Sequence, residues 1–496
     1  MPEKQVEAPI CSNYGPGEAP RWEVYSRCIH CGLCLNSCPT YRELGLEMDS
    51  PRGRIYQMIQ VENGRLPLTE SFVKHIDLCL DCRACETACP SGVEYGRLVE
   101  TARGQIDRYG KRPLMQRLFR NAFLYGLLPH RSRLELVGRL LRFYQRSGLE
   151  KLVLGSGVLH LFPGRLAKVA RLAPRMEKPF FTERLGTVVP AVGERRYRVA
   201  FFAGCIANLA FARLNDATVR VLARNGCEVV IPAAQGCCGA LHVHAGARNA
   251  ARDLAKRNIE AFGATPSPGA SRHPLPQGGE GSYPPGGKSN EQELPLPSLP
   301  SPPRGRAAGG EGVPKQAEAL GAFDAIITNA AGCGSVLKEY PLLFEEVDRE
   351  WHDRAVAFQR KMQDVTEFLA AIDLNRNLAP VKARSTYQDP CHLGHAQRIR
   401  TAPRRLLAAV PGLELVELKE TEVCCGSAGI YNVVHNEMAE QLLAAKMRRI
   451  DETGADIILT ANPGCLLQLR AGVARSGNKR RRVMHVVELL DEAYQG

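Results

Sequence analysis

Cysteines are the chemically most informative residues of this 496-residue chain, which contains 18 of them. Eight form two runs with the same pattern, C-x-x-C-x-x-C-x-x-x-C-P. The first run comprises Cys28, Cys31, Cys34 and Cys38, and the second comprises Cys79, Cys82, Cys85 and Cys89. Cysteines three residues apart on a tight loop can present three thiolates to one metal cluster. The spacing is that of bacterial ferredoxins, so it predicts iron–sulfur chemistry.

The fourth cysteine of each run precedes a proline and lies too far along the chain to close the same cube, so we expect it to serve the other cluster. Two [4Fe–4S] clusters with exchanged ligands follow from this. One set would be Cys28, Cys31, Cys34 and Cys89, and the other Cys79, Cys82, Cys85 and Cys38. Structural zinc, the main alternative, usually takes two separated pairs of ligands. Two complete runs of four favour iron and sulfide.

Eight more cysteines lie in a pattern that occurs twice. In each copy a single cysteine is followed by a Cys-Cys pair, 32 residues later in the first copy and 33 in the second, and then by a last cysteine. The first copy contains Cys205, Cys237, Cys238 and Cys333, and the second contains Cys391, Cys424, Cys425 and Cys465. Cys11 and Cys227 belong to neither zone. A lone cysteine often only fills a core, but pairs followed by glycine at the same place in two copies favour ligation.

Strand-like segments precede these cysteines. They cover residues 197–203, 228–231 and 324–328 in the first copy, and 385–388, 413–418 and 456–460 in the second, with helical patterns between them. Strand–helix alternation predicts a parallel sheet, and ligands of such sheets collect beyond the carboxyl ends of the strands. We therefore expect the four thiols of each copy to converge at one sheet edge and to bind a third and a fourth cluster of unspecified type.

The last interval differs between the copies, with 95 residues from Cys238 to Cys333 but 40 from Cys425 to Cys465. The excess of 55 is close to the length of segment 264–315, which is rich in proline, glycine and serine. Such a segment cannot bury enough apolar surface to offset its ordering entropy. We predict a disordered insertion without chemistry.

These patterns predict an α+β multidomain protein. The expected order is an N-terminal tail (1–20), an α-helical, ferredoxin-like two-cluster domain (21–110), a basic helical linker (111–196), and two α/β cysteine-rich repeats with parallel sheets (197–378 and 379–496). The first twenty residues lack the basic start and apolar run of a signal peptide. We therefore expect a cytoplasmic protein with reduced thiols.

The linker carries a concentration of positive charge within a chain whose net charge is +13. From Lys111 to Arg146 it has nine basic residues and one acid, Glu135, interleaved with leucine and aromatic residues at helical spacing. Solvated helices that pack one apolar side on a neighbouring domain are the preferred interpretation. The alternative is peripheral contact with the anionic inner face of the cytoplasmic membrane. No run of about 18 apolar residues predicts a spanning helix.

The motifs resemble those of the iron–sulfur subunit of bacterial glycolate oxidase, over nearly the whole chain except the first twenty residues and the insertion. The resemblance is carried by the two cysteine runs, by Ser50-Pro51-Arg52-Gly53-Arg54, by Gly236-Cys237-Cys238-Gly239 and Cys424-Cys425-Gly426, and by Asn462-Pro463-Gly464-Cys465. The repeats are similar to the cysteine-rich (CCG) domains of heterodisulfide reductases and of the small subunit of anaerobic glycerol-3-phosphate dehydrogenase. Those domains typically end in Cys-x-x-Cys, whereas Cys333 and Cys465 are followed by no second cysteine.

The resemblance implies an electron-transfer subunit of a flavin-dependent 2-hydroxy-acid dehydrogenase. A partner subunit with FAD would oxidise glycolate, and this chain would pass the electrons singly to a quinone-type membrane acceptor. We expect no catalytic residue here, and we interpret the histidines near the cysteines (His30, His242, His244, His392 and His395) as hydrogen-bonded structural residues.

Three alternatives stay open. The chain could serve a lactate or glycerol-3-phosphate dehydrogenase, or act as a thiol–disulfide enzyme of the heterodisulfide reductase type, which the missing cysteines disfavour. A nucleic-acid-binding or regulatory module with a cluster as sensor is the third. The spread of the basic residues over the linker and C-terminus disfavours nucleic acid as a partner.

Overall fold

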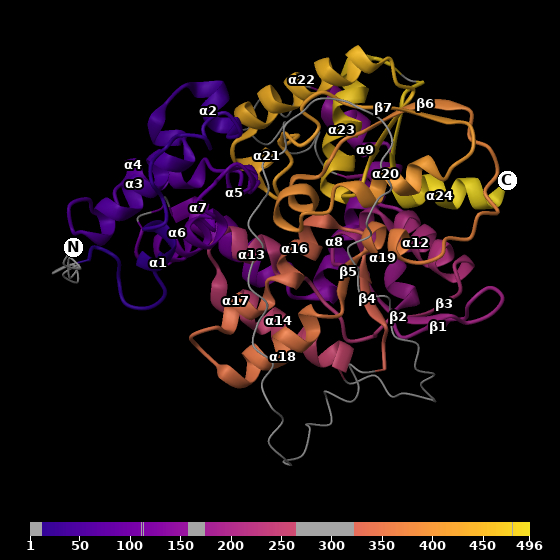
Figure 1. Ribbon diagram of the computed structural model, residues 1–496, viewed down its shortest axis with the longest axis horizontal. Coiled ribbons are helices and arrows are strands. Elements are labelled where there is room, and N and C mark those ends of the chain that lie inside the picture. The colour runs from indigo at the N-terminus through magenta and orange to yellow at the C-terminus, as the bar shows by residue number, and fades with distance from the viewer. Residues whose placement is uncertain (1–11, 111, 113, 157–173, 264–321, 479) are drawn as a thin grey trace, which may run out of the picture.

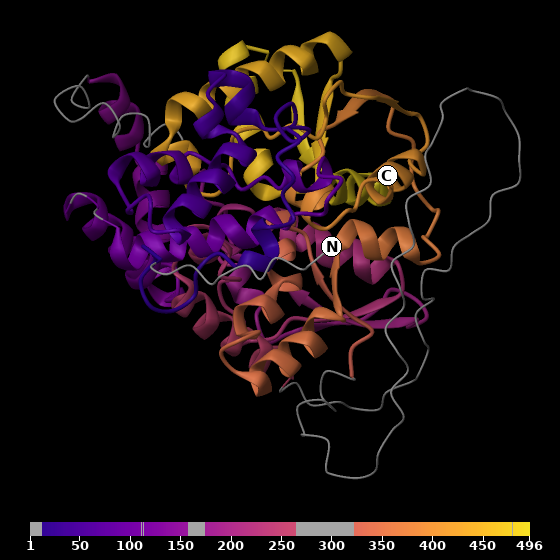
Figure 2. The same cartoon turned by 60° about the vertical axis from the view of Figure 1, so that its left-hand side comes forward.

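The computed structural model describes residues 12–110, 112, 114–156, 174–263, 322–478 and 480–496. In Figure 1 the N-terminal domain (indigo to violet) lies on one side of two cysteine-rich repeats, with the second repeat above the first. Figure 2 shows the same stacking after a turn of 60°. The predicted insertion (264–315) and Cys11 lie outside the described residues.

The N-terminal domain consists of short helices around the two cysteine runs. They are α1 (Trp22–Tyr25), α2 (Pro39–Leu44), the 3-10 turn η1 (Glu47–Asp49), α3 (Pro51–Glu62), α4 (Glu70–Asp77), α5 (Ala84–Thr87) and α6 (Tyr95–Tyr109). Ser50 and Thr69 begin α3 and α4 by accepting hydrogen bonds from the backbone of Gly53 and Phe72, which satisfies donors left free at a helix start. Their apolar faces meet α6 around the fully buried Met58.

Residues 12–20, part of the predicted tail, pack onto the rest of the protein. Tyr14 is buried in the core of the N-terminal domain. The Glu18 carboxylate accepts a hydrogen bond from Arg248 at 2.9 Å and another from Arg252. These bonds fasten the start of the described chain to the first repeat.

The linker begins with α7 (Leu114–Asn121), the π-helical turn η2 (Ala122–Leu127), α8 (Arg131–Arg146) and α9 (Leu149–Gly155). Leu124 of η2 is fully buried, and its carbonyl accepts a hydrogen bond from His242 of the first repeat at 2.7 Å. Beyond the helices the linker departs from the helical prediction. After the 3-10 turn η4 (Phe181–Arg184) comes a strand, β1 (Val188–Val189), which joins the sheet of the first repeat.

The first repeat is built on a five-stranded sheet in the order β1-β3-β2-β4-β5. Its strands after β1 are β2 (Tyr197–Phe202), β3 (Cys227–Val230), β4 (Ala325–Thr328) and β5 (Met362–Asp364), all parallel. Only β1 runs antiparallel, beside β3. The helices are α11 (Ala207–Ala210), α12 (Ala212–Arg224), α13 (Ala240–His244), α14 (Arg248–Gly263), α16 (Ala331–Lys338), α17 (Tyr340–Phe344), α18 (Arg349–Gln359) and α19 (Val365–Ala371).

The second repeat has a four-stranded sheet in the order β7-β6-β8-β9. This order corresponds to β3-β2-β4-β5 of the first repeat, and all of the pairings are parallel. Its strands are β6 (Ala383–Tyr387), β7 (Leu413–Val416), β8 (Ile457–Thr460) and β9 (Arg482–His485). Its helices are α20 (Thr401–Ala408), α21 (Tyr431–Val434), α22 (Asn436–Thr453), α23 (Pro463–Ser476) and α24 (Val486–Gln495), with a π-helical turn η5 (His392–Ala396). The predicted fold class, with its repeats and parallel sheets, is confirmed.

The two repeats share one hydrophobic core that extends across both sheets. Helix α12 packs on α24, where Arg220 forms a bidentate ion pair with Asp491 at 2.6 and 3.1 Å. The last strand of each repeat ends in a buried residue that caps the next helix, Asp364 in β5 and His485 in β9, each within a capping box. A repeated cap at the same place indicates that both copies follow one folding plan.

Candidate metal centres

Both N-terminal cysteine runs wind through the same backbone conformation. The residues on either side of the second cysteine of each run have positive φ angles. The angles are 55° and 82° for His30 and Gly32, and 54° and 63° for Asp81 and Arg83. Three of these four residues are not glycine, so the conformation costs energy at each of them. It bends the backbone of both loops in the same way.

Four cysteines of the predicted second set surround one cavity. Its lining includes Cys38 from the first run and Cys79, Cys82 and Cys85 from the second. All four side chains are buried. Burial raises the pKa of the Cys82 and Cys85 thiols above the ordinary value. A cationic metal centre offsets this effect, because it binds the thiolate form. Four thiols around a cavity are the donor set that a [4Fe–4S] cluster requires.

Buried arginines stand beside this cavity. The fully buried Arg54 donates to the carbonyl of His75 at 2.7 Å and to Oγ1 of Thr40 at 3.1 Å, and its Nη1 lies 4.0 Å from Sγ of Cys38. Burial alone would lower the pKa of Arg54, but the acidic groups around it raise the pKa, so the side chain is cationic. A buried positive charge stabilises thiolates and the added electron of a reduced cluster.

The predicted first set is much closer to solvent. Cys31 is exposed, and Cys28, Cys34 and Cys89 are partly buried. Burial raises the pKa of Cys28, and the neighbouring Cys89 and Cys31 add to the rise. Burial also raises the pKa of Cys34 to about 11. The side chains of Ile29 and Leu33, in the same loop, are 69% and 60% exposed.

The four cysteines of the first repeat come together beyond strands β2, β3 and β4. Sγ of Cys238 lies 3.1 Å from Sγ of Cys333, and Cys237 is hydrogen-bonded to both Cys205 and Cys238. The glycine after the pair, Gly239, has a φ of 83°. A residue with a side chain is strained in that conformation, which explains why glycine follows the cysteines.

The second repeat places its cysteines in the same way. Hydrogen bonds link the thiols of Cys391, Cys424, Cys425 and Cys465 in that order. Gly426 has a φ of 86°, and a Cβ there would lie 2.6 Å from the carbonyl oxygen of Ala439. Hydrogen bonds from Cys424 and Cys465 hold the pKa of Cys425 well below its ordinary value. We call the two groups tetrad 1 (Cys205, Cys237, Cys238, Cys333) and tetrad 2 (Cys391, Cys424, Cys425, Cys465). Cys227 is buried in β3, apart from both.

An ionic junction joins the second cysteine run to both repeats. Asp81 accepts hydrogen bonds from Arg83 and from His244 of the first repeat, each at 2.9 Å, and its carbonyl accepts one from His392 of the second at 2.9 Å. Arg83 also binds Glu100 at 2.8 Å and Glu339 at 3.2 Å. Arg83 and His244 supply the positive charge that these carboxylates face in the junction.

The two histidines of the junction hold different charges. Burial and the neighbouring His244 lower the pKa of His392 to about 4, so that His392 is neutral. Burial alone would lower the pKa of His244, but its hydrogen bonds to Asp81 and Glu100 raise it to about 9. Both histidines are hydrogen-bonded, as predicted. The sequence reasoning missed Asp81 and Arg83, although charged residues inside a cysteine run were a usable signal.

The second cysteine run also packs directly on tetrad 2. Leu80 and Cys82 share an apolar cluster with Cys424, Tyr431 and Met438, and Cys391 lies at its edge. The hydroxyl of Tyr431 donates to the carbonyl of Leu78 at 2.9 Å. Tetrads 1 and 2 are joined in turn by Asn462, which accepts from the backbone of Gly332 at 3.3 Å and donates to Sγ of Cys465 at 3.4 Å.

Family models match three parts of the chain. A 4Fe-4S dicluster domain matches residues 24–93, the linker region of the glycolate oxidase iron-sulfur subunit matches 115–173, and a cysteine-rich domain matches 199–268 and 385–470. With the grouped thiols, these matches define an iron–sulfur protein with a dicluster domain and two cysteine-rich repeats.

Comparison with curated relatives identifies the family within this class of iron–sulfur protein. The chain is 38% identical to the probable glycolate oxidase iron-sulfur subunit of Bacillus subtilis over 470 residues, 94% of this chain and 93% of that protein. It is 30% identical to the glycolate oxidase iron-sulfur subunit of Escherichia coli over 475 residues, 95% of each. Lactate utilization protein A of a Geobacillus strain is 28% identical over 59% of this chain and 99% of its own length. The chain belongs to the glycolate oxidase iron–sulfur subunit family.

Proposed function

We propose that this chain is the electron-transfer subunit of a 2-hydroxy-acid dehydrogenase that acts on glycolate. A partner subunit that carries FAD would oxidise the acid, and a quinone-type acceptor would take the electrons. The observation that carries the proposal is that Cys38, Cys79, Cys82 and Cys85 line one cavity while the thiols within tetrad 1 and within tetrad 2 lie in contact. One-electron transfer is the chemistry that iron–sulfur clusters supply when bound at such sets.

The proposed ligands are those of the sequence analysis. Cys28, Cys31, Cys34 and Cys89 would hold cluster 1, and Cys79, Cys82, Cys85 and Cys38 would hold cluster 2. Tetrads 1 and 2 would hold two further iron–sulfur centres. Around these sets the chain excludes water, as at the buried Cys82 and Cys85, and supplies positive charge through Arg54 and Arg83. Burial and nearby charge are the means by which a protein sets cluster potentials.

The difference in exposure suggests where the flavoprotein docks. Cys31 is exposed between the exposed apolar side chains of Ile29 and Leu33, whereas cluster 2 would lie at the centre of the three domains. We therefore place electron entry at the loop of cluster 1. Electrons would move inward to cluster 2.

Lactate in place of glycolate is the second candidate substrate of the partner, and the similarity to lactate utilization protein A favours it. A thiol–disulfide enzyme is less well supported. The positions three residues after Cys333 and Cys465 are occupied by Val336 and Gln468, each only 1% exposed within its helix. No thiol stands there to complete a Cys-x-x-Cys pair.

We place the chain in the cytoplasm, with peripheral contact at the inner face of the membrane. Among the described residues no helix is both long and apolar enough to cross a bilayer. The linker helices nevertheless expose large apolar side chains beside their basic residues. These include Leu114, Met115, Leu118 and Phe119 in α7, Leu136, Leu140 and Phe143 in α8, and Leu152 in α9. Exposed apolar groups with basic neighbours suit an anionic lipid surface.

Vesicle co-sedimentation tests the membrane contact. Wild-type protein should sediment with vesicles containing anionic lipid and not with neutral vesicles. Phe143→Glu should abolish binding, while Val347→Glu, at an exposed site outside the linker, should not. Equal binding of the two variants would contradict the proposal.

Anaerobic co-purification from the native host tests the main proposal. We expect a flavoprotein to accompany the chain, iron and sulfide to be present, and glycolate to generate the EPR signals of reduced clusters. Recovery of the chain alone with zinc would overturn the proposal. Signals generated by lactate but not by glycolate would favour the second substrate.

A further inference from the structure

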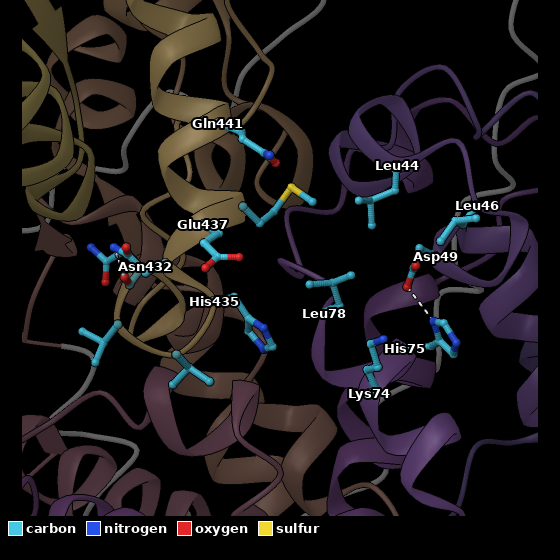
Figure 3. Close-up of a pocket in the computed structure, with 14 residues that line it drawn as sticks. Leu44, Leu46, Asp49, Lys74, His75, Leu78, Asn432, His435, Glu437 and Gln441 are labelled. Atoms are coloured by element: carbon cyan, nitrogen blue, oxygen red, sulfur yellow. Dashed lines mark hydrogen bonds and ion pairs between the residues drawn. The ribbon is translucent and has the colours of Figure 1, made fainter. Parts of the chain in front are cut away.

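A cleft lies between the N-terminal domain and the second repeat (Figure 3). Its volume is about 480 Å³, within the usual range for small-molecule sites. Helices α21 and α22 line one side, and α4 and the segment after α2 line the other. The lining residues are Leu44, Leu46, Asp49, Lys74, His75, Leu78, Asn432, Val433, Val434, His435, Asn436, Glu437, Met438 and Gln441.

The cleft lies next to the proposed site of cluster 2, although the two have no lining residue in common. Leu78 precedes Cys79 in the chain, and its carbonyl accepts the Tyr431 hydroxyl at 2.9 Å. Asp49 presents its side chain towards the cleft, while its backbone carbonyl accepts a hydrogen bond from Sγ of Cys38 at 3.7 Å. A molecule in the cleft would therefore be separated from two cluster 2 ligands by about one residue of protein. That position favours a ligand that exchanges electrons.

The lining selects among such ligands. Leu44, Leu46 and Leu78 supply an apolar wall on the side of the N-terminal domain (Figure 3). Val434 of α21 and Met438 of α22 add apolar surface on the side of the second repeat. Apolar walls on two sides suit a flat, uncharged ring.

Hydrogen-bond donors are placed at the edge of that space. Nδ1 of His75 is hydrogen-bonded to Oδ1 of Asp49 at 2.8 Å, which fixes the ring in one orientation. Lys74 stands beside it in Figure 3. Either side chain can donate to a carbonyl oxygen. Asp49 is paired with Arg54 at 3.5 Å and with His75 at 2.8 Å. The carboxylate of Glu437 disfavours an anionic organic acid as the occupant, because like charges repel.

We propose that this cleft binds the ring of a quinone, the electron acceptor of the complex, an inference that rests on the function proposed above. His75 and Lys74 would donate hydrogen bonds to the quinone carbonyl oxygens. The quinone gains two electrons, delivered singly through this chain, and two protons from solvent at the open side of the cleft. It leaves as the hydroquinone, and the electron donor is the hydroxy acid oxidised on the partner.

The first test measures binding without turnover. Menadione, a naphthoquinone without an isoprenoid tail, is equilibrated at micromolar concentration by dialysis with the holo-protein and with two variants. Val434→Trp fills the cleft and should weaken binding at least about tenfold. Val347→Trp, a matched substitution at an exposed valine outside the cleft, should bind as the wild type does. Failure of the wild type to bind menadione, or equal binding by both variants, would overturn the proposal.

The second test separates this inference from the function itself. In the complete complex, glycolate-dependent reduction of menadione is compared with reduction of ferricyanide, an ion that can take electrons at a protein surface. The ratio of the two rates should fall at least about tenfold in Val434→Trp and not in Val347→Trp. A wild-type complex that reduces neither acceptor would contradict the proposed function, whereas an unchanged ratio in Val434→Trp would contradict only the quinone site.

Direct labelling covers the case in which Val434→Trp fails to fold. A photoactivatable azidoquinone is crosslinked to the wild-type protein, and the labelled peptides are sequenced. Labels on the segments that contain His75 or Val434 support the site, and labels elsewhere reject it. Loss of flavoprotein capture in Leu46→Trp, at a half-exposed leucine of the cleft, would instead identify the cleft as a subunit interface.

Discussion

The two cysteine runs share one spacing and one backbone conformation, yet they lie in opposite environments. The first loop faces solvent, with Cys31 exposed between the exposed Ile29 and Leu33. The second is enclosed by the N-terminal domain and both repeats, and its charged residues Asp81 and Arg83 are bonded to both repeats. The shared motif therefore fixes the backbone of the two loops but not their burial or their charged neighbours, which depend on the rest of the fold.

The largest difference between the two runs is expected when one cysteine ligand is removed from each and the stabilities of the two variants are compared. Cys82→Ser removes a buried thiol in the apolar cluster that joins the second run to tetrad 2, so we expect loss of cluster 2 and a fall of more than about 3 kcal/mol in the free energy of unfolding. Cys31→Ser removes an exposed thiol. It should prevent cluster 1 from binding but lower the free energy of unfolding less than Cys82→Ser does. Iron analysis, EPR and chemical unfolding measure both effects. Equal losses of stability in the two variants would contradict the expected difference between the buried and the exposed run.

The ionic junction should show the next largest effect. Arg83→Met removes the cation that Asp81 and Glu100 share and leaves these buried carboxylates with His244 and the more distant Arg103, which costs about 3–5 kcal/mol of stability. The matched control is Arg97→Met, because Arg97 forms ion pairs with the partly exposed Glu94 and Glu345. Such surface pairs contribute at most about 1 kcal/mol. Thermal unfolding of both variants measures the two losses of stability. If Arg97→Met were as unstable as Arg83→Met, burial would not determine how much stability an ion pair contributes.

Arg54 and Arg52 provide a test of cluster potential. Arg54→Met removes a buried positive charge beside Cys38, so the added electron is less stabilised and the potential of cluster 2 should fall by roughly 60 mV, a tenfold change for one electron. Arg52 lies near cluster 1 but is paired with Glu47 at 2.8 Å on the surface. Arg52→Met should shift the potential of cluster 1 much less. Redox titration followed by EPR resolves the two, and a larger shift for Arg52→Met would contradict the argument.

The smallest effect on the folded protein is expected at the exposed loop. Ile29→Asp should change the free energy of unfolding by no more than about 0.5 kcal/mol, as surface substitutions generally do. It should nevertheless weaken association with the flavoprotein about tenfold, because a charge then replaces an apolar contact. Surface plasmon resonance measures the association, with Val347→Asp as control. Unchanged affinity would place the flavoprotein elsewhere.

Much of this organisation was predictable from local patterns. The six predicted strands of the repeats correspond to β2, β3, β4, β6, β7 and β8, because each is a short apolar segment before a cysteine or turn. The short strands β1 and β5 and the basic strand β9 (Arg482–His485) were not predicted. β1 and β5 have only two and three residues, so their strand conformation depends on pairing with a neighbouring strand.

The chemistry of the sites was predictable to a similar depth. The spacing of the cysteines predicted which thiols would be ligands, because ligand geometry is encoded within a few residues. The junction was not foreseeable, since Asp81 and His392 are 311 positions apart. The burial of Arg54 and the cleft beside Leu78 likewise depend on how the N-terminal domain sits against the second repeat.

The sequence by itself determined the cysteine spacing, the repeated strand–helix plan and the family, because these reside in local spacing and periodicity. Only the tertiary structure decided which run is buried, which charges surround it, and where a cleft opens beside it. Burial and electrostatics arise from contacts between distant segments, and no short stretch of the chain carries that information.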